Sequence, residues 1–260
     1  PEAAVSISAA MRGSAEITIG NVLGSNILNV LVILGLTAII CKVPVQKTTV
    51  HYEIPMVIVV TILMAVLGLQ NNVIGRLEGI FLLACMVVYL LDLLRLAKRG
   101  VSHDGTLDEV AENSSIVKLL FLAIVGVLAI VWGSDIAVSA ATSIARIFGM
   151  SERFIGLTIV AMGTSAPEAA VSITATLQGS ADITIGNVMG SNIMNVLVIL
   201  GVAATLTSIR VARSTVSLEI PFMIVSSIVL LVLGLDGSIT FWDGVILWGF
   251  FLIYLAYLFY

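Results

Sequence analysis

One block of this sequence occurs twice, and the repeat limits the chain to folds built from two matching halves. Residues 1–40 align without a gap to residues 167–206, and 29 of the 40 positions are identical. The copied motifs are PEAAVSI, ITIGNV, GSNI and NVLVILG, and the match continues to an EIP tripeptide that begins at Glu53 and again at Glu219. A gapless internal repeat of this length predicts two copies of one structural unit that pack together.

The repeats lie in a chain that is too apolar to be a water-soluble body of this size. Hydrophobic residues make up 59% of the sequence and charged residues 11%, whereas a soluble domain carries roughly 25% charged residues. Continuous apolar runs at 54–69, 80–94 and 119–131 approach the roughly 20 residues of a membrane-crossing helix and lack the alternation of a membrane β-barrel strand. We therefore predict an all-α polytopic membrane protein, with the lipid bilayer as its partner.

The order of the predicted spans indicates that the two repeats are inverted. We predict helical spans at residues 1–12, 15–41, 53–69, 73–97, 115–147, 152–178, 181–206, 216–234 and 239–260. Five crossings then separate Glu2 from its copy Glu168, so the copies enter the bilayer from opposite sides. Inverted repeats are typical of secondary transporters, whose binding site lies near the bilayer midplane. The predicted organisation is a first half at 1–97, a short polar linker at 98–114 and a second half at 115–260.

The segment GTSAPE, residues 163–168, predicts a break inside a membrane helix. Pro167 has no backbone N–H and clashes with the preceding turn, so we expect one helix to stop near Met162 and another to begin at Pro167. The freed backbone groups must face protein or a watery cavity, because an unsatisfied group in lipid costs several kcal/mol. In the next span, Gly186 and Gly190 are expected to let another backbone approach closely.

Two glutamates lie in these interrupted membrane segments, and they predict a cation site. Glu168 is on one helical face with Ser165 and Ser172, and Glu2 with Ser6 repeats part of that pattern. A charge at the bilayer centre costs roughly 2.5–3.5 kcal/mol, and the repeated cores contain no Lys or Arg partner, so a bound cation is the remaining compensation. Carboxylate, hydroxyl, amide and carbonyl oxygens suit Ca²⁺ or Na⁺. Two carboxylates carry a charge that one Ca²⁺ or two Na⁺ would cancel.

Other classes of function are disfavoured by what the sequence lacks. The net charge of −4 comes without a basic block, which argues against nucleic-acid binding. Cys41, Cys85, His51 and His103 do not form a metal-ligand pattern or a disulfide framework, so we expect no cofactor, and no obligate protein partner is indicated. An intramembrane serine hydrolase would need a positioned base, and neither histidine lies in a predicted span. We therefore do not expect an enzyme.

The motif GTSAPE and the twice-occurring GNVxGSNIxN resemble the two α-repeats of the sodium/calcium exchanger family, within the cation/calcium antiporter superfamily. The resemblance covers nearly the whole chain. It implies an inverted-repeat ten-helix exchanger fold lacking helix 1 and the first half of helix 2, because the counterpart of residues 115–166 would precede Pro1. It also implies secondary active exchange of Ca²⁺ for Na⁺ by alternating access. The short loop between repeats is similar to that of prokaryotic members and implies the plasma membrane of a bacterium or archaeon.

Carried over by position, the resemblance implies a set of residues that hold the transported ions. They are Glu2, Ser25, Asn29, Ala161 (through its backbone carbonyl), Thr164, Ser165, Glu168, Ser191 and Asn195. The chain departs from the family pattern at Asn195, where several members carry Asp, and the first-copy GTSA segment is absent. Two alternatives stay open at this point. A buried glutamate could carry H⁺ in place of Na⁺, and oxygen-lined helix breaks could also serve a passive cation channel.

Overall fold

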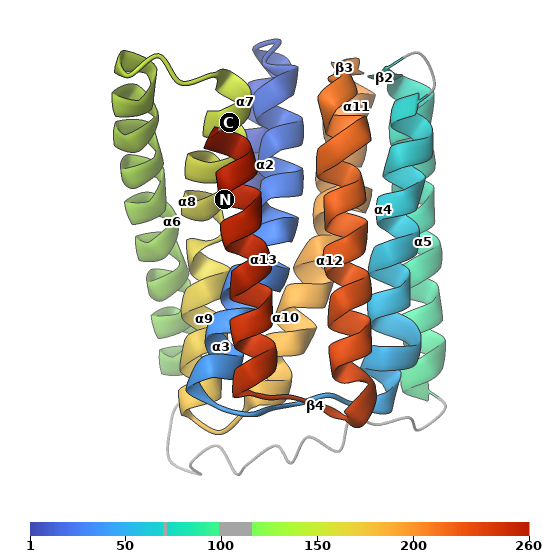
Figure 1. Cartoon of the computed structure of the whole chain (residues 1–260), viewed down its shortest axis with the longest axis vertical. Helices are drawn as coiled ribbons and strands as arrows, with labels where there is room; N and C mark the ends of the chain where they lie inside the picture. The colour runs from blue at the N-terminus through green and yellow to red at the C-terminus, as the bar shows by residue number, and fades with distance from the viewer. Residues whose placement is uncertain (70–71, 99–115, 260) are drawn as a thin grey trace.

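The computed structural model describes residues 1–69, 72–98 and 116–259, which form an upright bundle of helices (Figure 1). The expected linker at 98–114 lies almost wholly outside the described residues. The first half comprises α1 (Glu2–Met11), α2 (Ala15–Leu28), η1 (Asn29–Ile33), α3 (Leu34–Ile40), β1 (Val43–Pro44), η2 (Thr49–Glu53), α4 (Ile54–Leu69), β2 (Val73–Ile74) and α5 (Arg76–Lys98). The second half comprises α6 (Ile116–Ile147), α7 (Glu152–Ile155), η3 (Gly156–Val160), α8 (Ala161–Thr164), α9 (Ala166–Leu177), α10 (Ala181–Met194), η4 (Asn195–Leu200), α11 (Gly201–Leu206), β3 (Ile209–Arg210), η5 (Thr215–Glu219), α12 (Ile220–Leu233), η6 (Gly234–Asp236), β4 (Ser238–Ile239) and α13 (Phe241–Phe259).

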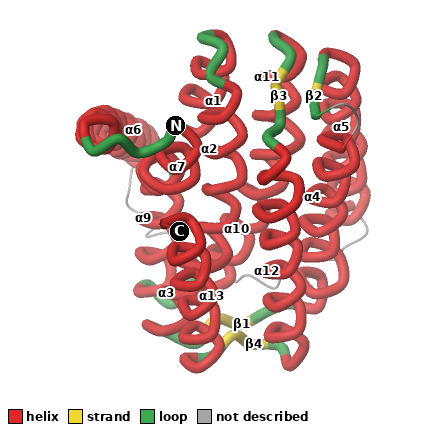
Figure 2. The backbone as a smooth tube through the Cα atoms, turned by 45° about the horizontal axis from the view of Figure 1, so that its top comes forward, coloured by secondary structure: helices red, strands yellow, loops and turns green. Residues whose placement is uncertain are grey.

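The two halves run in opposite directions, which confirms the predicted inversion. The helix formed by α2, η1 and α3 descends in Figure 1, whereas the helix formed by α10, η4 and α11 ascends. Two short antiparallel pairs join the halves at opposite ends of the bundle (Figure 2): β1 pairs with β4, and β2 pairs with β3. Each pair takes one strand from each half, so the same connection is made once at each end of the molecule.

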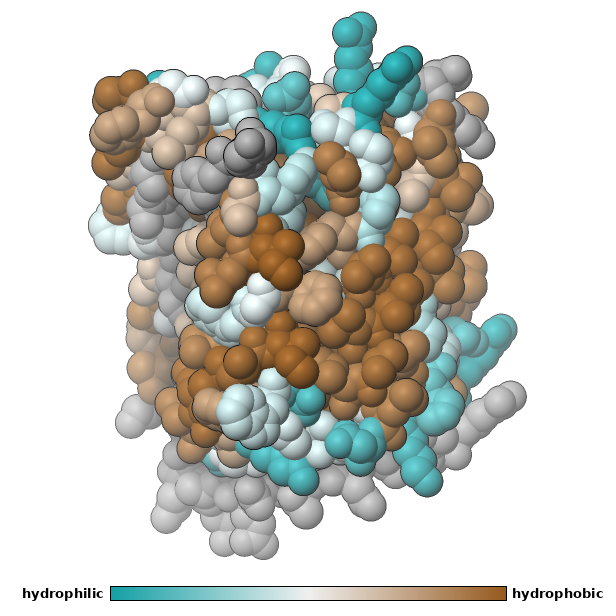
Figure 3. Space-filling model, viewed as in Figure 1, coloured by the Kyte–Doolittle hydropathy of each residue, from teal (hydrophilic) through white to brown (hydrophobic). Residues whose placement is uncertain are grey.

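The repeated helices form the centre of the bundle, and the other long helices surround them. In Ala15–Ile40, 78% of the most apolar stretch is buried, and in Ala181–Leu206 the buried share is 67%. In the other four long apolar helices the buried share is only 17% to 39%. These six described helices are long and apolar enough to cross a membrane, and the bent pair Arg153–Thr164 and Ala166–Leu177 would be a seventh span. On the face seen in Figure 3, brown apolar side chains form a wide band with teal hydrophilic groups above and below it. Such a surface suits lipid contact.

Five segments of the described helices are π-helical, a feature that the sequence patterns did not predict. Four of them form two copied pairs: η1 with η4, and η2 with η5. Glu53 and Glu219 end η2 and η5, so each lies a turn inside its helix. Single π-helical turns are frequent at functional sites, and Asn29 and Asn195 each begin one of these segments.

The predicted helix break is present, but it is shorter than expected. The first helix continues to Thr164, only Ser165 departs from helical geometry, and α9 begins at Ala166, with a bend of 44° between the two helices. Pro167 is in the first turn of α9, where a backbone N–H has no acceptor within that helix and its absence is tolerated. One residue therefore suffices for the break, and the expected unwound stretch from Met162 to Pro167 does not form.

We expected another backbone to approach Gly186 and Gly190 closely, and within the described residues this expectation is wrong. The equivalent glycines of the first copy, Gly20 and Gly24, do have such a close neighbour. A Cβ on Gly24 would lie 2.6 Å from the Leu157 carbonyl oxygen, and one on Gly20 would lie 3.1 Å from the Gly156 backbone. No described atom lies within 4 Å of such a Cβ on Gly186 or Gly190. The segment from α7 to α8 packs against α2, and no described helix takes the equivalent place against α10.

A buried ion pair fastens the start of the broken helix to two neighbouring helices. The Arg153 guanidinium donates hydrogen bonds to the Glu219 carboxylate and to the Tyr257 hydroxyl, and that hydroxyl also lies 3.0 Å from the same carboxylate oxygen. Glu219 is fully buried. These contacts support a structural role for Glu219.

We expect Glu219→Leu to destabilise the fold strongly, because it leaves the half-buried Arg153 without its partner. Loss of one member of a buried ion pair costs about 3–5 kcal/mol, whereas replacing both members with apolar residues is often neutral. The double variant Arg153→Met/Glu219→Leu should therefore unfold at a higher temperature than the single variant. Thermal unfolding in detergent micelles measures this difference, and equal midpoints for the two variants would show that the ion pair contributes nothing.

Candidate functional site

The candidate site lies where the short helices α1 and α9 cross the central helices α2 and α10. Asn21 on α2 donates hydrogen bonds to the Glu2 carbonyl oxygen (3.3 Å) and to the Ser6 hydroxyl (2.8 Å). Its copy Asn187 on α10 makes the equivalent bond to the Glu168 carbonyl oxygen, at 3.1 Å. Each glutamate-bearing helix is thus held against its central helix by a copied asparagine.

The structure brings the two predicted glutamates together. Glu2 is buried and Glu168 is half-buried, and the two carboxyl groups lie close enough to interact electrostatically. The Ser165 hydroxyl donates to Glu2 Oε1 at 3.3 Å. Oε2 of Glu168 is buried and has no hydrogen-bond partner among the described residues, and the backbone nitrogen of Pro1 lies 3.7 Å from Glu2 Oε2. Two acids from oppositely directed halves therefore lie side by side.

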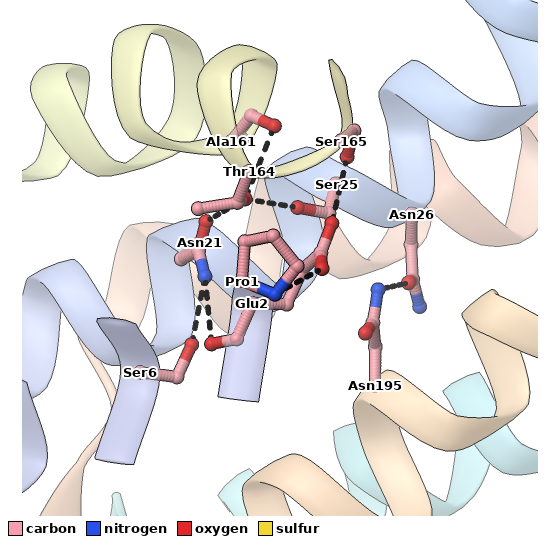
Figure 4. Close-up of polar contacts among 10 residues, drawn as sticks. All are labelled: Pro1, Glu2, Ser6, Asn21, Ser25, Asn26, Ala161, Thr164, Ser165 and Asn195. Atoms are coloured by element: carbon pink, nitrogen blue, oxygen red, sulfur yellow. Dashed lines mark hydrogen bonds and ion pairs between the residues drawn. The ribbon is translucent and has the colours of Figure 1, made fainter. Parts of the chain in front are cut away.

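Thr164 connects the broken helix to the first central helix (Figure 4). Its Oγ1 donates to Asn21 Oδ1 at 2.8 Å, and Ser25 Oγ lies 3.4 Å from it. It also lies 3.3 Å from the Ala161 carbonyl oxygen, which accepts the helical bond from the Ser165 N–H. The Ala161 carbonyl is thus engaged within its helix in this structure, and one lone pair remains for another ligand.

The two predicted amide ligands, Asn29 and Asn195, belong to a second polar cluster. Asn29 Nδ2 donates to Asn192 Oδ1, and Asn195 Nδ2 donates to Asn26 Oδ1, each at 2.9 Å. All four side chains are buried. Asn26 and Asn192 were not among the candidates predicted from the sequence. Their presence in both copies of the GSNI motif could have indicated a shared role.

The predicted residues are therefore distributed unevenly in the structure. Six of them form one connected group, which we call the carboxyl-containing group: Glu2, Ser25, Ala161, Thr164, Ser165 and Glu168. Asn29 and Asn195 belong to the second polar cluster, and each lies one helical turn beyond one of the two copied serines. Ser191 is half-buried on α10, and no hydrogen bond of its side chain joins it to either group within the described residues.

The chemistry of this group suits a small cation. No described Lys, Arg or His side chain forms an ion pair with Glu2 or Glu168, and no three His, Cys, Asp or Glu side chains gather in the described part of the chain. The available donors are two carboxyl groups, three hydroxyls, a backbone carbonyl and amide oxygens. Oxygen donors of this kind bind hard cations such as Ca²⁺ and Na⁺ in preference to soft metals.

Known proteins share both the sequence and the fold. The family model described as sodium/calcium exchanger protein matches residues 1–94 and 118–260. The inner membrane protein YrbG of Escherichia coli K12 is 33% identical over 100% of this chain and 82% of its own length. The sodium/calcium exchanger MaX1 of Methanosarcina acetivorans is 38% identical over 55% of this chain and 41% of its own. The solved structure of the sodium-calcium exchanger NCX_Mj superimposes with a TM-score of 0.78 at 29% identity, covering 98% of this chain and 81% of that one.

Proposed function

The chain belongs to the sodium/calcium exchanger family, and from that premise we propose that it exchanges Ca²⁺ for Na⁺ across its membrane by alternating access. The family consists of integral, multi-pass membrane transporters and not of enzymes. Its members carry Ca²⁺ and Na⁺ as transported substrates and need no cofactor. The proposal for this chain is the coupling of the two ions and the place where they bind.

We place the ion site at the meeting point of Glu2 and Glu168. The observation that carries the proposal is that these two carboxyl groups, one buried and one half-buried and one from each inverted half, lie together without a Lys, Arg or His partner in the described residues. One Ca²⁺ or two Na⁺ would neutralise the pair. Binding of either substrate therefore excludes the other, which is the requirement for exchange.

The other oxygen donors complete the proposed coordination. Ca²⁺ takes six to eight oxygens, and two carboxylates provide at most four. Ser25, Thr164 and Ser165 supply hydroxyls beside the acids, and the Ala161 carbonyl and the amide oxygens of Asn29 and Asn195 supply the rest. Ser191, the copy of Ser25, stays in the proposal as the matching donor from α10.

The inverted arrangement supports alternating access over a passive pore. Each half presents a short glutamate-bearing helix, α1 or α9, against a central helix, and the two units point in opposite directions. A site between such units can be opened by one half or by the other. A channel needs no such pair of gates.

Ion-gradient-resolved flux tests the function. We expect proteoliposomes of the purified protein to accumulate ⁴⁵Ca²⁺ when Na⁺ is high inside and low outside, and to release it when the Na⁺ gradient is collapsed. Accumulation driven by a pH gradient in the absence of Na⁺ would identify H⁺ as the coupling ion instead. Ca²⁺ flux that follows only its own gradient, with no counter-ion, would contradict antiport.

A further inference from the structure

Four buried asparagines form a closed network between the two central helices, at equivalent positions of the two repeats. Asn26 Nδ2 donates to the Asn192 carbonyl oxygen at 3.2 Å, and Asn192 Nδ2 donates to the Asn26 carbonyl oxygen at 3.3 Å. The remaining two bonds run from Asn29 to Asn192 Oδ1 and from Asn195 to Asn26 Oδ1. Asn29 is fully buried, and none of the four is more than 4% exposed.

The direction of every hydrogen bond in this network follows from its two backbone carbonyls. A carbonyl oxygen can only accept, so the atoms of Asn26 and Asn192 that face the carbonyls must be the NH₂ groups. Their side-chain oxygens are then the atoms that face Asn195 and Asn29, and these oxygens also only accept. Asn195 and Asn29 must therefore turn their own NH₂ groups toward the network, and each is left with its amide oxygen pointing elsewhere.

The side-chain oxygen that the network does not use is available for another ligand in Asn29. Asn29 Oδ1 is buried and accepts no hydrogen bond from the described residues, although a buried amide oxygen is normally satisfied. Asn29 follows Ser25 by four residues on one face of the helix, and Ser25 contacts Thr164 in the carboxyl-containing group. The π-helical segment that begins at Asn29 packs against α9, which carries Glu168.

We propose that Asn26 and Asn192 are positioning residues that orient the Asn195 and Asn29 carboxamides with oxygen, and not NH₂, toward the transported cation. This inference rests on the proposed function and adds two residues that do not themselves touch the ion. Without the network, either carboxamide could rotate by half a turn and present hydrogens to a cation. The network also explains why an amide at 195 fits here, because an ionised Asp at that position could not donate to Asn26 Oδ1.

The test compares equilibrium ⁴⁵Ca²⁺ binding and transport kinetics of the purified protein with those of Asn192→Leu and of Thr184→Val. Thr184 makes a buried hydrogen bond to the Ser172 carbonyl oxygen between α10 and α9, so its loss reports on helix packing alone. We expect Asn192→Leu to weaken Ca²⁺ binding and raise the Ca²⁺ KM at least tenfold, with kcat changed less than KM. Thr184→Val should lower the unfolding temperature and leave the Ca²⁺ KM within about twofold.

A second variant keeps the inference testable where Asn192→Leu does not fold. Asn192→Asp can donate to the Asn26 carbonyl oxygen only when its carboxyl group is protonated, and in that form it copies the native bonds. Its Ca²⁺ affinity relative to the native protein should therefore rise as the pH falls. The positioning role would be overturned if the ratio of the Asn192→Asp affinity to the native affinity did not change with pH. It would also be overturned if the Ca²⁺ KM of Asn192→Leu stayed within about twofold of the native value, as expected for Thr184→Val.

The outcome for the native protein separates this inference from the proposed function. Native protein that binds Ca²⁺, together with variants that bind it equally well, contradicts only the role of Asn26 and Asn192. Native protein that binds no Ca²⁺ contradicts the proposed function, and the inference falls with it.

Discussion

Glu168→Gln is expected to abolish Ca²⁺ binding. The substitution keeps the size of the side chain and removes one of the two negative charges that share the buried site. The remaining charge no longer balances a divalent ion, and loss of one member of a buried charged contact costs about 2–5 kcal/mol or more. That loss corresponds to a fall in affinity of at least about thirtyfold. Equilibrium ⁴⁵Ca²⁺ binding to the purified protein measures it.

The matched control for this prediction is Glu16→Gln. Glu16 lies at the start of α2, is exposed, and is outside the carboxyl-containing group. It loses the same charge without touching the site, so Ca²⁺ affinity should stay near the native value. Unchanged affinity in Glu168→Gln, or an equal loss in Glu16→Gln, would remove Glu168 from the site.

Gly24→Ala is expected to disrupt the helix contact that supports Thr164, and to reduce transport at least tenfold. The new Cβ would lie 2.6 Å from the Leu157 carbonyl oxygen and 2.7 Å from Ala161 Cβ. The first of these is a backbone atom that cannot rotate away. Overpacking of this kind costs about 1–3 kcal/mol, which exceeds the gain of up to about 1 kcal/mol from replacing a helical glycine by alanine. Thermal unfolding and ⁴⁵Ca²⁺ uptake should both report the loss.

The repeat supplies a control at the equivalent position of the other half. Gly190→Ala adds the same methyl group to α10, where no described atom lies within 4 Å of it. The helix-propensity gain then acts unopposed, so this variant should unfold at the same or a higher temperature and retain uptake. Equal destabilisation of the two variants would show that the close approach of η3 and α8 to α2 is not what requires a glycine at position 24.

The helical membrane fold, its inversion and the meeting of Glu2 with Glu168 could be predicted because each depends on patterns along the chain. Apolar runs fix the spans, the count of crossings fixes the direction of the second copy, and the absence of a basic partner points to a cation. The break at Ser165 was predicted to within a few residues because Pro167 restricts the local backbone. It is shorter than expected because proline is tolerated in the first turn of α9.

Features that depend on contacts between the copies could not be predicted in the same way. Gly20 and Gly186 occur in identical motifs, yet within the described residues only Gly20 meets another backbone. The local sequence does not show which helix packs on which copy. The bonds between Asn26 and Asn192 cross 166 residues, and the pairing of Arg153 with Glu219 joins two helices whose sequences share no pattern. The π-helical turns at Asn29 and Asn195 leave no trace in a hydrophobic period of 3.6 residues.

The most direct test of the central claim is the position of a bound divalent ion in crystals of the purified protein soaked in Sr²⁺, located by anomalous scattering. We predict one strong peak between the carboxyl groups of Glu2 and Glu168, within coordinating distance of both. A peak bound elsewhere, with the two carboxyl groups apart or turned toward lipid, would contradict the shared site and the exchange mechanism built on it.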